Sequence, residues 1–169
     1  MSARGPSTDS SQSGRSAARL AAVQALYQID LTAGRVDSVI GEFTVHRLGA
    51  TIDGDSYTKA DLALFTDLVK GVTQRRTEID LLLDEGLSDD WTPKRLEAIL
   101  RAILRAGIYE LLVRADVPAR VVINEYLDVA HAFFDGSQPA LVNGVLDTLA
   151  RQLRGAELSP GTPKTVKAG

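Results

Sequence analysis

The apolar residues between positions 96 and 112 constrain the fold more than any other feature of this sequence. They recur at intervals of three and four residues, which places them on one broad face of an α-helix. The members of this stripe are Leu96, Ile99, Leu100, Ile103, Leu104, Ile108, Leu111 and Leu112. The stripe predicts a helix from Pro93 to Arg114, the strongest secondary-structure element of the chain.

Weaker helical periods occupy most of the remaining sequence, which shows very little strand-like alternation. Pro118 suits the first turn of a helix, and Ser137 is a candidate N-cap. Gly71 marks a bend or a close approach by another helix. The further helices predicted span residues 15–32, 36–48, 58–84 (one long helix or two stacked pieces), 118–134, and a last stretch ending at Leu153.

These periods predict an all-α fold, a compact helical protein of six or seven helices in two small lobes. We expect the split near Gly86, with residues 14–85 in the N-terminal lobe and residues 86–154 in the C-terminal lobe. Residues 1–13 and 155–169 contain little to bury and are predicted to be disordered. A length of 169 residues fits such an arrangement around a shared core.

The composition excludes several classes of function. The chain has no cysteine, so disulfides, thiolate metal sites and cysteine nucleophiles are excluded. No apolar run approaches the roughly 20 residues that span a bilayer, and the first residues lack the apolar stretch of a signal peptide, which predicts a cytoplasmic protein. Acidic residues outnumber basic ones by 22 to 19, so any contact with nucleic acid must come from a local cluster of cations.

The sequence offers few candidates for metal binding. His46 and His131 are far apart and have no partner at ligand spacing, so we interpret both as solvated or packing residues. Asp53 and Asp55 suggest a calcium loop, but Leu64 occupies the twelfth position, where a bidentate glutamate is required. We therefore predict no metal site.

Catalytic candidates are equally few. Asp89 and Asp90 look like paired carboxylates, but their place just before Trp91 indicates that they complement a helix N-terminus. No glycine-rich phosphate loop or nucleophile elbow occurs. We predict neither an enzymatic activity nor a cofactor.

Polar residues and glycines inside the apolar helices need an explanation. We interpret Asn124, Glu125 and Asn143 as members of a buried hydrogen-bond network that ties helices together. A close approach between helices would explain Gly107 and Gly144, each of which costs about 1 kcal/mol relative to alanine. Asn-Gly between apolar residues is also a hairpin signal, but the helical period on both sides favours a helix.

A ridge of residues at i, i+4 spacing starts the first helix: Arg15, Arg19, Val23 and Tyr27. Arginine matches phosphate in a bidentate geometry, and an aromatic face can stack on an unpaired base. The positive end of the helix dipole would lie beside Arg15. The alternative is a soluble helix start with a tyrosine packed on the core.

Five segments in this order resemble the bacterial NusB family of transcription antitermination factors: "AVQALYQ", "LVKGV", "ILRAGIYELL", "VPARVVINEYLDVAHAFF" and "LVNGVLDTL". The resemblance covers nearly everything from Arg15 to Leu153. It implies a two-lobed helical fold that binds the single-stranded boxA element of ribosomal RNA leaders together with NusE, a ribosomal protein. This complex helps RNA polymerase to resist premature termination.

The resemblance also implies which residues form the RNA surface: Arg15, Ser16, Arg19, Tyr27, Gly136, Ser137 and Leu141. Lys94, Glu97 and Arg101 stand opposite the apolar stripe, and with the resemblance they predict a docking face for NusE. A helical adaptor or homodimer with no direct role in RNA binding is the alternative. The sequence leaves the oligomeric state open and predicts no membrane contact.

Overall fold

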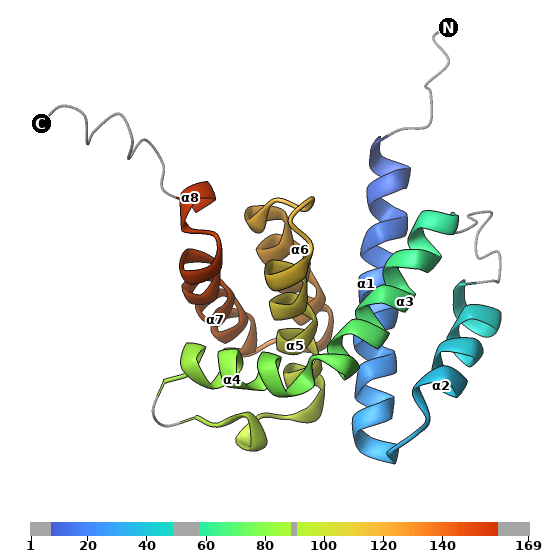
Figure 1. Ribbon diagram of the computed structural model, residues 1–169, viewed down its shortest axis with the longest axis horizontal. Helices are drawn as coiled ribbons and strands as arrows, with labels where there is room; N and C mark the ends of the chain where they lie inside the picture. Colours follow the sequence, from blue (N-terminus) through green and yellow to red (C-terminus); the bar gives the residue numbers. More distant parts are fainter. Residues whose placement is uncertain (1–7, 49–57, 89–90, 159–169) are drawn as a thin grey trace, which may run out of the picture. The chain divides into compact units, whose positions relative to one another are not determined.

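A computed structural model describes residues 8–48, 58–88 and 91–158 of the chain, and all its regular elements there are helices. The prediction of an all-α fold is confirmed. Figure 1 shows the elements in chain order. They are α1 (Thr8–Thr32), α2 (Val36–Phe43), the π-helical turn η1 (Thr44–Leu48), α3 (Lys59–Gln74), α4 (Arg76–Gly86), the 3-10 turn η2 (Pro93–Arg95), α5 (Ala98–Val113), α6 (Ala119–Phe133), α7 (Gln138–Leu153) and α8 (Gly155–Leu158).

Both ends of the described chain are more helical than predicted. Helix α1 begins at Thr8, so residues 8–13 are helical although we predicted disorder, and α8 lies inside the predicted disordered tail. The region 58–84 forms two helices, one of the two arrangements predicted. They separate at Arg75, one turn after Gly71, whose carbonyl accepts a hydrogen bond from the Arg75 backbone. The calcium-loop candidates and the acidic pair before Trp91 lie outside the described residues.

The chain divides into two compact units between Arg76 and Thr77, earlier than the predicted split near Gly86. Apart from Arg76, which pairs with Asp30 of α1, helix α4 belongs to the second unit and has contacts there. Arg105 of α5 holds Asp80 through two hydrogen bonds of 2.8 and 3.0 Å. A Cβ placed on Gly86 would lie 3.1 Å from Leu149 of α7, so only a glycine fits there without a shift of its neighbour.

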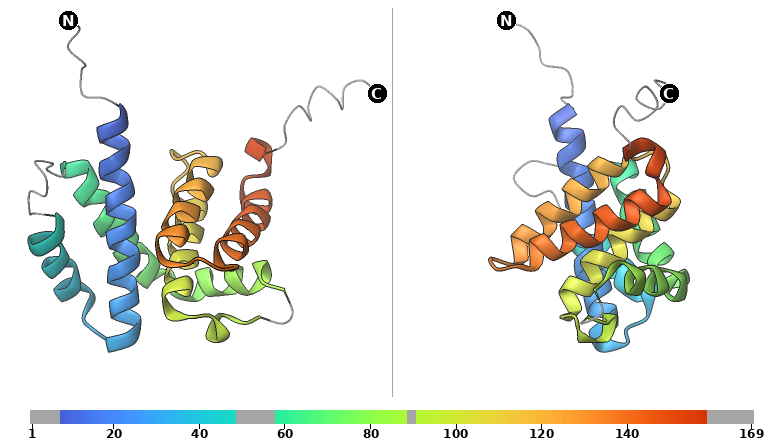
Figure 2. Two further views of the ribbon diagram at one scale, coloured as in Figure 1. Left: turned by 180° about the vertical axis from the view of Figure 1, so that it is seen from behind. Right: turned by 90° about the vertical axis from the view of Figure 1, so that its left-hand side faces the viewer.

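In the first unit, α1 packs along α3, and α2 packs against both (Figure 2). Small residues of α1 allow this close packing, because Ala18, Ala22 and Ala25 are all fully buried. The rings of Phe43 and Phe65 stack at 5.8 Å between centroids and fix α2 against α3.

Gly14 brings the first part of α1 against the start of α3. A Cβ at Gly14 would lie 2.4 Å from Oδ2 of Asp61. That carboxylate accepts from the Thr58 backbone N–H, while the Thr58 hydroxyl accepts from the Asp61 N–H, which forms a capping box. The glycine therefore leaves room for the N-cap of a neighbouring helix.

In the second unit, α5 packs against α6 and α7, and these two also pack against each other. Gly107 lies where they meet, because an added Cβ would be 3.0 Å from Leu146 of α7 and 3.4 Å from Tyr126 of α6. The predicted close helix approach is confirmed at this glycine. Tyr126 also donates a hydrogen bond from its hydroxyl to Glu110, whose side chain is fully buried.

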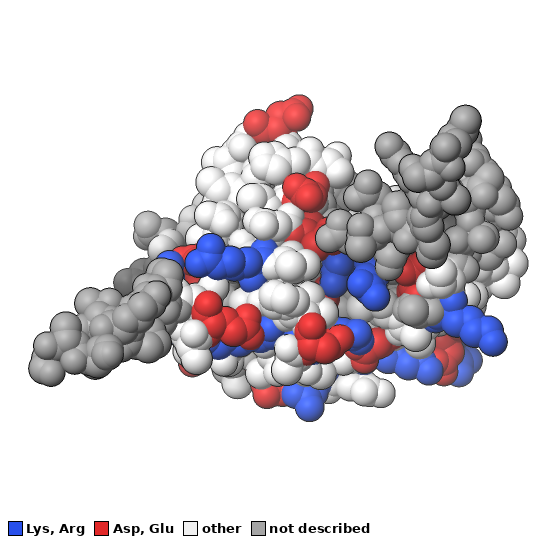
Figure 3. Space-filling model, turned by 90° about the horizontal axis from the view of Figure 1, so that it is seen from above, with Lys and Arg blue, Asp and Glu red and all other residues white. Residues whose placement is uncertain are grey.

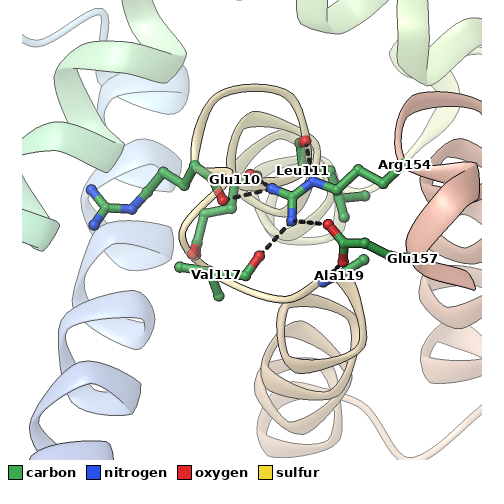
Figure 4. A network of polar contacts seen from close by, with 7 residues as sticks. Glu110, Leu111, Val117, Ala119, Arg154 and Glu157 are labelled. Carbon is green, nitrogen blue, oxygen red and sulfur yellow. Dashed lines mark hydrogen bonds and ion pairs between the residues drawn. The ribbon is translucent and has the colours of Figure 1, made fainter.

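Arg154, just after α7, closes the C-terminal end of α5 (Figure 4). Its Nε donates to the carbonyl of Leu111 at 2.9 Å, and its Nη1 donates to that of Val117. Its Nη2 donates to the carbonyls of Glu110 and Arg114 at 2.7 and 2.6 Å. Carbonyls near the end of a helix lack intrahelical partners, and a cation there also complements the helix dipole. One side chain therefore completes the last turn of α5 and the turn that follows.

The short helix α8 extends this arrangement to α6. Glu157 lies 3.4 Å from Arg154 and accepts a 2.8 Å hydrogen bond from the backbone N–H of Ala119, the first residue of α6. The next residue, Leu158, is buried. Residues 154–158 are therefore an ordered part of the second unit.

The predicted buried amide network is wrong. Asn124 and Asn143 are exposed, and Glu125 is half-buried. Gly144 is exposed as well, and a Cβ added there would meet nothing within 4 Å, so close helix packing does not explain it. The buried polar contacts of the second unit come instead from side chains that the sequence analysis did not single out, such as Glu110 and Arg154.

Candidate nucleic-acid interface

Arg15 is exposed on α1, and the length of that helix changes what surrounds it. Because α1 begins at Thr8, Arg15 lies about two turns inside the helix and not at its start. The helix dipole acts mainly within the first turn, so the predicted help from the dipole is wrong. An anion at Arg15 would therefore be bound by the guanidinium group, without help from the helix dipole.

The predicted ridge is not one continuous surface. Arg19 is 2% exposed and Val23 is fully buried, whereas Arg15 before them and Tyr27 after them are exposed. Ser16 is half-buried. In this structure Arg19 cannot reach a phosphate directly, which corrects its prediction as an RNA contact.

Tyr27 has an exposed fraction of 37%, and Leu31, one turn later, has 57%. The tyrosine ring is therefore available for stacking, as the RNA interpretation requires. It lies about 18 Å along the helix from Arg15. The first unit thus presents a cation and an aromatic ring as two separate points of contact.

In the second unit, the candidate RNA residues gather at the start of α7. Gly136 and Ser137 are exposed, and Leu141 is half-buried one turn later. Ser137 occupies the N-cap position, but its side chain makes no capping hydrogen bond. The Ser137 hydroxyl therefore does not make the capping hydrogen bond that we predicted.

The predicted partner face surrounds the junction of η2 and α5. Lys94 and Glu97 are exposed. Arg101 is half-buried, and its Nη1 donates a 2.9 Å hydrogen bond to the carbonyl of Leu96, across the break between the 3-10 turn and the helix. The single predicted helix from Pro93 to Arg114 is thus a turn followed by a helix, and Arg101 stabilises the joint.

Next to this face lies an aromatic residue that the sequence analysis treated only as a neighbour of acidic residues. Trp91 is 42% exposed, and the guanidinium carbon of Arg95 lies 5.9 Å from the centroid of its ring. Tryptophan and arginine are enriched among the residues that dominate binding energies at interfaces. The helical period could not have found Trp91, because it lies outside the helix.

The charges of the described residues are mixed in sign. On the face seen in Figure 3, Lys and Arg side chains lie among Asp and Glu side chains. Such a surface provides no long-range attraction for a polyanion, so binding of RNA depends on individual contacts. This agrees with the net charge of −3.

His46 and His131 are both exposed, and within the described residues no group of three or more His, Cys, Asp or Glu side chains is placed to hold a metal ion. None of the described helices combines the length and the apolar character needed to cross a membrane.

The model of the NusB family matches residues 16–151 of the chain. The chain belongs to the NusB family. It is 51% identical over 160 residues to the transcription antitermination protein NusB of Bradyrhizobium sp. (strain ORS 278), a match that covers 93% of this chain and 95% of that one. The NusB of Rhizobium rhizogenes (strain K84 / ATCC BAA-868) is 52% identical over 141 residues, or 83% of this chain and 88% of its own.

Solved structures of the NusB family share the fold. T. maritima NusB matches with a TM-score of 0.72 and 26% identity over 85% of this chain and 96% of that one. A complex of the antitermination factors NusB and NusE with double-stranded RNA matches with a TM-score of 0.70 and 25% identity over 83% of this chain and 98% of that one. The family resemblance seen in the sequence is therefore confirmed.

Proposed function

We propose that this protein is a transcription antitermination factor that acts by binding and not by catalysis. With the ribosomal protein NusE, it binds boxA-type single-stranded RNA in ribosomal RNA leaders, in the cytoplasm, and helps RNA polymerase to resist termination. Family membership carries this proposal. The relatives named as antitermination proteins share about half of their residues with this chain over most of its length, and a solved structure of the same fold holds NusE and RNA.

The structure supports separate RNA contacts on each unit. On α1, Arg15 supplies a phosphate contact and Tyr27 a stacking platform, with Ser16 as a half-buried neighbour. On the second unit, Gly136, Ser137 and Leu141 supply polar and apolar contacts to nucleotides. Arg19 acts from within the core, by holding α1 in place.

The partner protein docks beside η2 and the start of α5. Lys94 and Glu97 are exposed there and give the face both signs of charge, which suits a protein surface better than a polyanion. Arg101 keeps the joint between η2 and α5 in shape through its bond to Leu96.

The deciding experiment is a titration of the full chain with fluorescent boxA-type RNA, with and without NusE. A scrambled single strand and a duplex of the same sequence serve as controls. We expect preferential binding of the boxA strand, strengthened by NusE, and a logarithm of affinity that falls with the logarithm of salt concentration by about 0.7 per phosphate contacted. Binding of NusE with equal, weak affinity for all three RNAs would instead favour a helical protein–protein adaptor.

A further inference from the structure

We propose that Asn143 and Gly144 of α7 form an RNA contact that reads nucleotides rather than phosphates. This inference rests on the proposed function and extends it along the helix beyond Ser137 and Leu141. It assigns to these two residues a role in sequence selection.

The fold does not account for either residue. Asparagine and glycine both disfavour the interior of a helix relative to alanine. Asn143 and Gly144 are exposed, and the space next to the Gly144 Cα is open to 4 Å. At Gly107 the same residue type is explained by Leu146 at 3.0 Å from an added Cβ. Gly41 and Asn124 are exposed in helices in the same way, so what distinguishes Asn143 and Gly144 is their place next to Ser137 and Leu141.

The position of Gly144 continues the proposed RNA contact. It lies one turn after Leu141 and two turns after Ser137 on the same helix, so the three face a common side. Asn143 lies one turn after the exposed Ala140, on the adjoining part of the outer side of α7. The sequence from Gly136 to Leu146 contains neither an acidic residue nor a cation, so these positions supply no charged group to a phosphate. Asp135 precedes this stretch, and Asp147, one turn after Gly144, pairs with Arg151 at 3.0 Å.

The chemistry of the two residues suits a base and its sugar. An asparagine amide offers both a donor and an acceptor, which matches the edges of unpaired bases and the 2′-hydroxyl. The missing side chain at Gly144 lets a nucleotide approach the helix backbone closely. A protein partner is disfavoured, because the exposed positions Ser137, Ala140, Asn143 and Gly144 include no aromatic or arginine anchor.

The test compares Gly144→Ala and Asn143→Ala with the unaltered protein, using thermal melts and anisotropy titrations with boxA-type and scrambled single strands. Both variants fold with melting temperatures that are unchanged or higher, because alanine favours the helix. We expect the affinity for the boxA strand to fall about tenfold in each, the loss of one base contact. Affinity for the scrambled strand and the salt dependence stay the same, since no phosphate contact is removed.

Two control variants show whether the effect belongs to this part of α7. Gly41→Ala alters another exposed helical glycine whose added Cβ meets nothing within 4 Å, and Asn124→Ala alters the exposed amide of α6. Both should bind RNA like the unaltered protein. Unchanged boxA affinity in the α7 variants, an equal loss in the controls, or a loss confined to NusE binding overturns the inference. If the unaltered protein shows no preference for boxA, the proposed function fails and the inference falls with it.

Discussion

At the C-terminal end of α5, the backbone carbonyls of the last turn and of the turn after it receive hydrogen bonds from Arg154, a side chain 7% exposed. In the middle of α7, Asn143 and Gly144 face outward, and the glycine has open space beside it. Both regions belong to the second unit, and both contain polar groups that a helix alone does not satisfy or favour. The fold explains the presence of Arg154 in the first region, but it does not explain Asn143 and Gly144 in the second.

The comparison separates two reasons for an unusual residue in a helix. Around α5, the neighbours supply the partners, so a change there acts first on stability. Along the outer side of α7, no packing contact gives a reason for the glycine, so a change there acts first on binding.

Arg154→Ala should produce the largest loss of stability, about 4 kcal/mol. The carbonyls of Leu111 and Val117 lose the donor that Arg154 supplies, whereas those of Glu110 and Arg114 keep backbone donors. Each unsatisfied polar group costs roughly 1–3 kcal/mol. Urea denaturation followed by circular dichroism measures the change. Arg151→Ala is the matched control, because that side chain is 64% exposed and pairs with Asp147, one turn away. Its effect should stay within about 0.5 kcal/mol. An equal loss of stability in the two variants would show that the contacts of Arg154 stabilise the protein no more than an exposed ion pair does.

Gly107→Ala should destabilise the protein by about 2 kcal/mol, because the added methyl group enters a filled space between helices. An added Cβ would lie 3.0 Å from two methyl carbons of Leu146. Gly144→Ala, the same change in an open position, should instead stabilise by up to about 1 kcal/mol. Melting temperatures that move in opposite directions support the division between the two regions, and a shared direction contradicts it.

The sequence was sufficient for the helical elements because apolar spacing depends only on local geometry. It predicted the C-terminal ends of α5 and α7 to within one residue and found the close approach at Gly107. It could not distinguish Gly107 from Gly144, since both lie in helices with apolar residues around them and only the packing of three helices differs. The contacts of Arg154 were also invisible, because its partners lie 37 to 44 residues away along the chain.

The candidate RNA residues of α1 show the same limit in the first unit. The i, i+4 spacing correctly placed Arg15 and Arg19 on one helix, but it carried no information on which of them α1 buries. The start of α1 at Thr8 was hidden as well, because residues 8–13 have the polar composition of a disordered segment. Arg15 and Tyr27 are the residues of this surface whose exposure agrees with the RNA interpretation.

Arg19→Ala tests the buried member of this pair. The side chain is 2% exposed, and its removal takes away both packing of the aliphatic stem and polar contacts of the guanidinium. We expect a loss of about 1 kcal/mol in stability, measured by urea denaturation. Arg19→Lys, which keeps the stem and the charge, should recover part of that loss. If Arg19→Ala is as stable as the unaltered protein, Arg19 is not a buried structural residue and is again a candidate for RNA contact.

Arg15→Ala should give the smallest change in stability and a specific change in binding. The side chain is exposed, so the free energy of unfolding should stay within about 0.5 kcal/mol of the original. If Arg15 contacts one phosphate, its loss should reduce the slope of log affinity against log salt concentration by about 0.7. Because a phosphate contact carries no sequence information, boxA and scrambled strands should lose affinity by the same factor. This result is the reverse of that expected for Asn143→Ala, which should affect the boxA strand alone and leave the salt slope as it is. An unchanged slope with Arg15→Ala would remove α1 from the phosphate-binding surface.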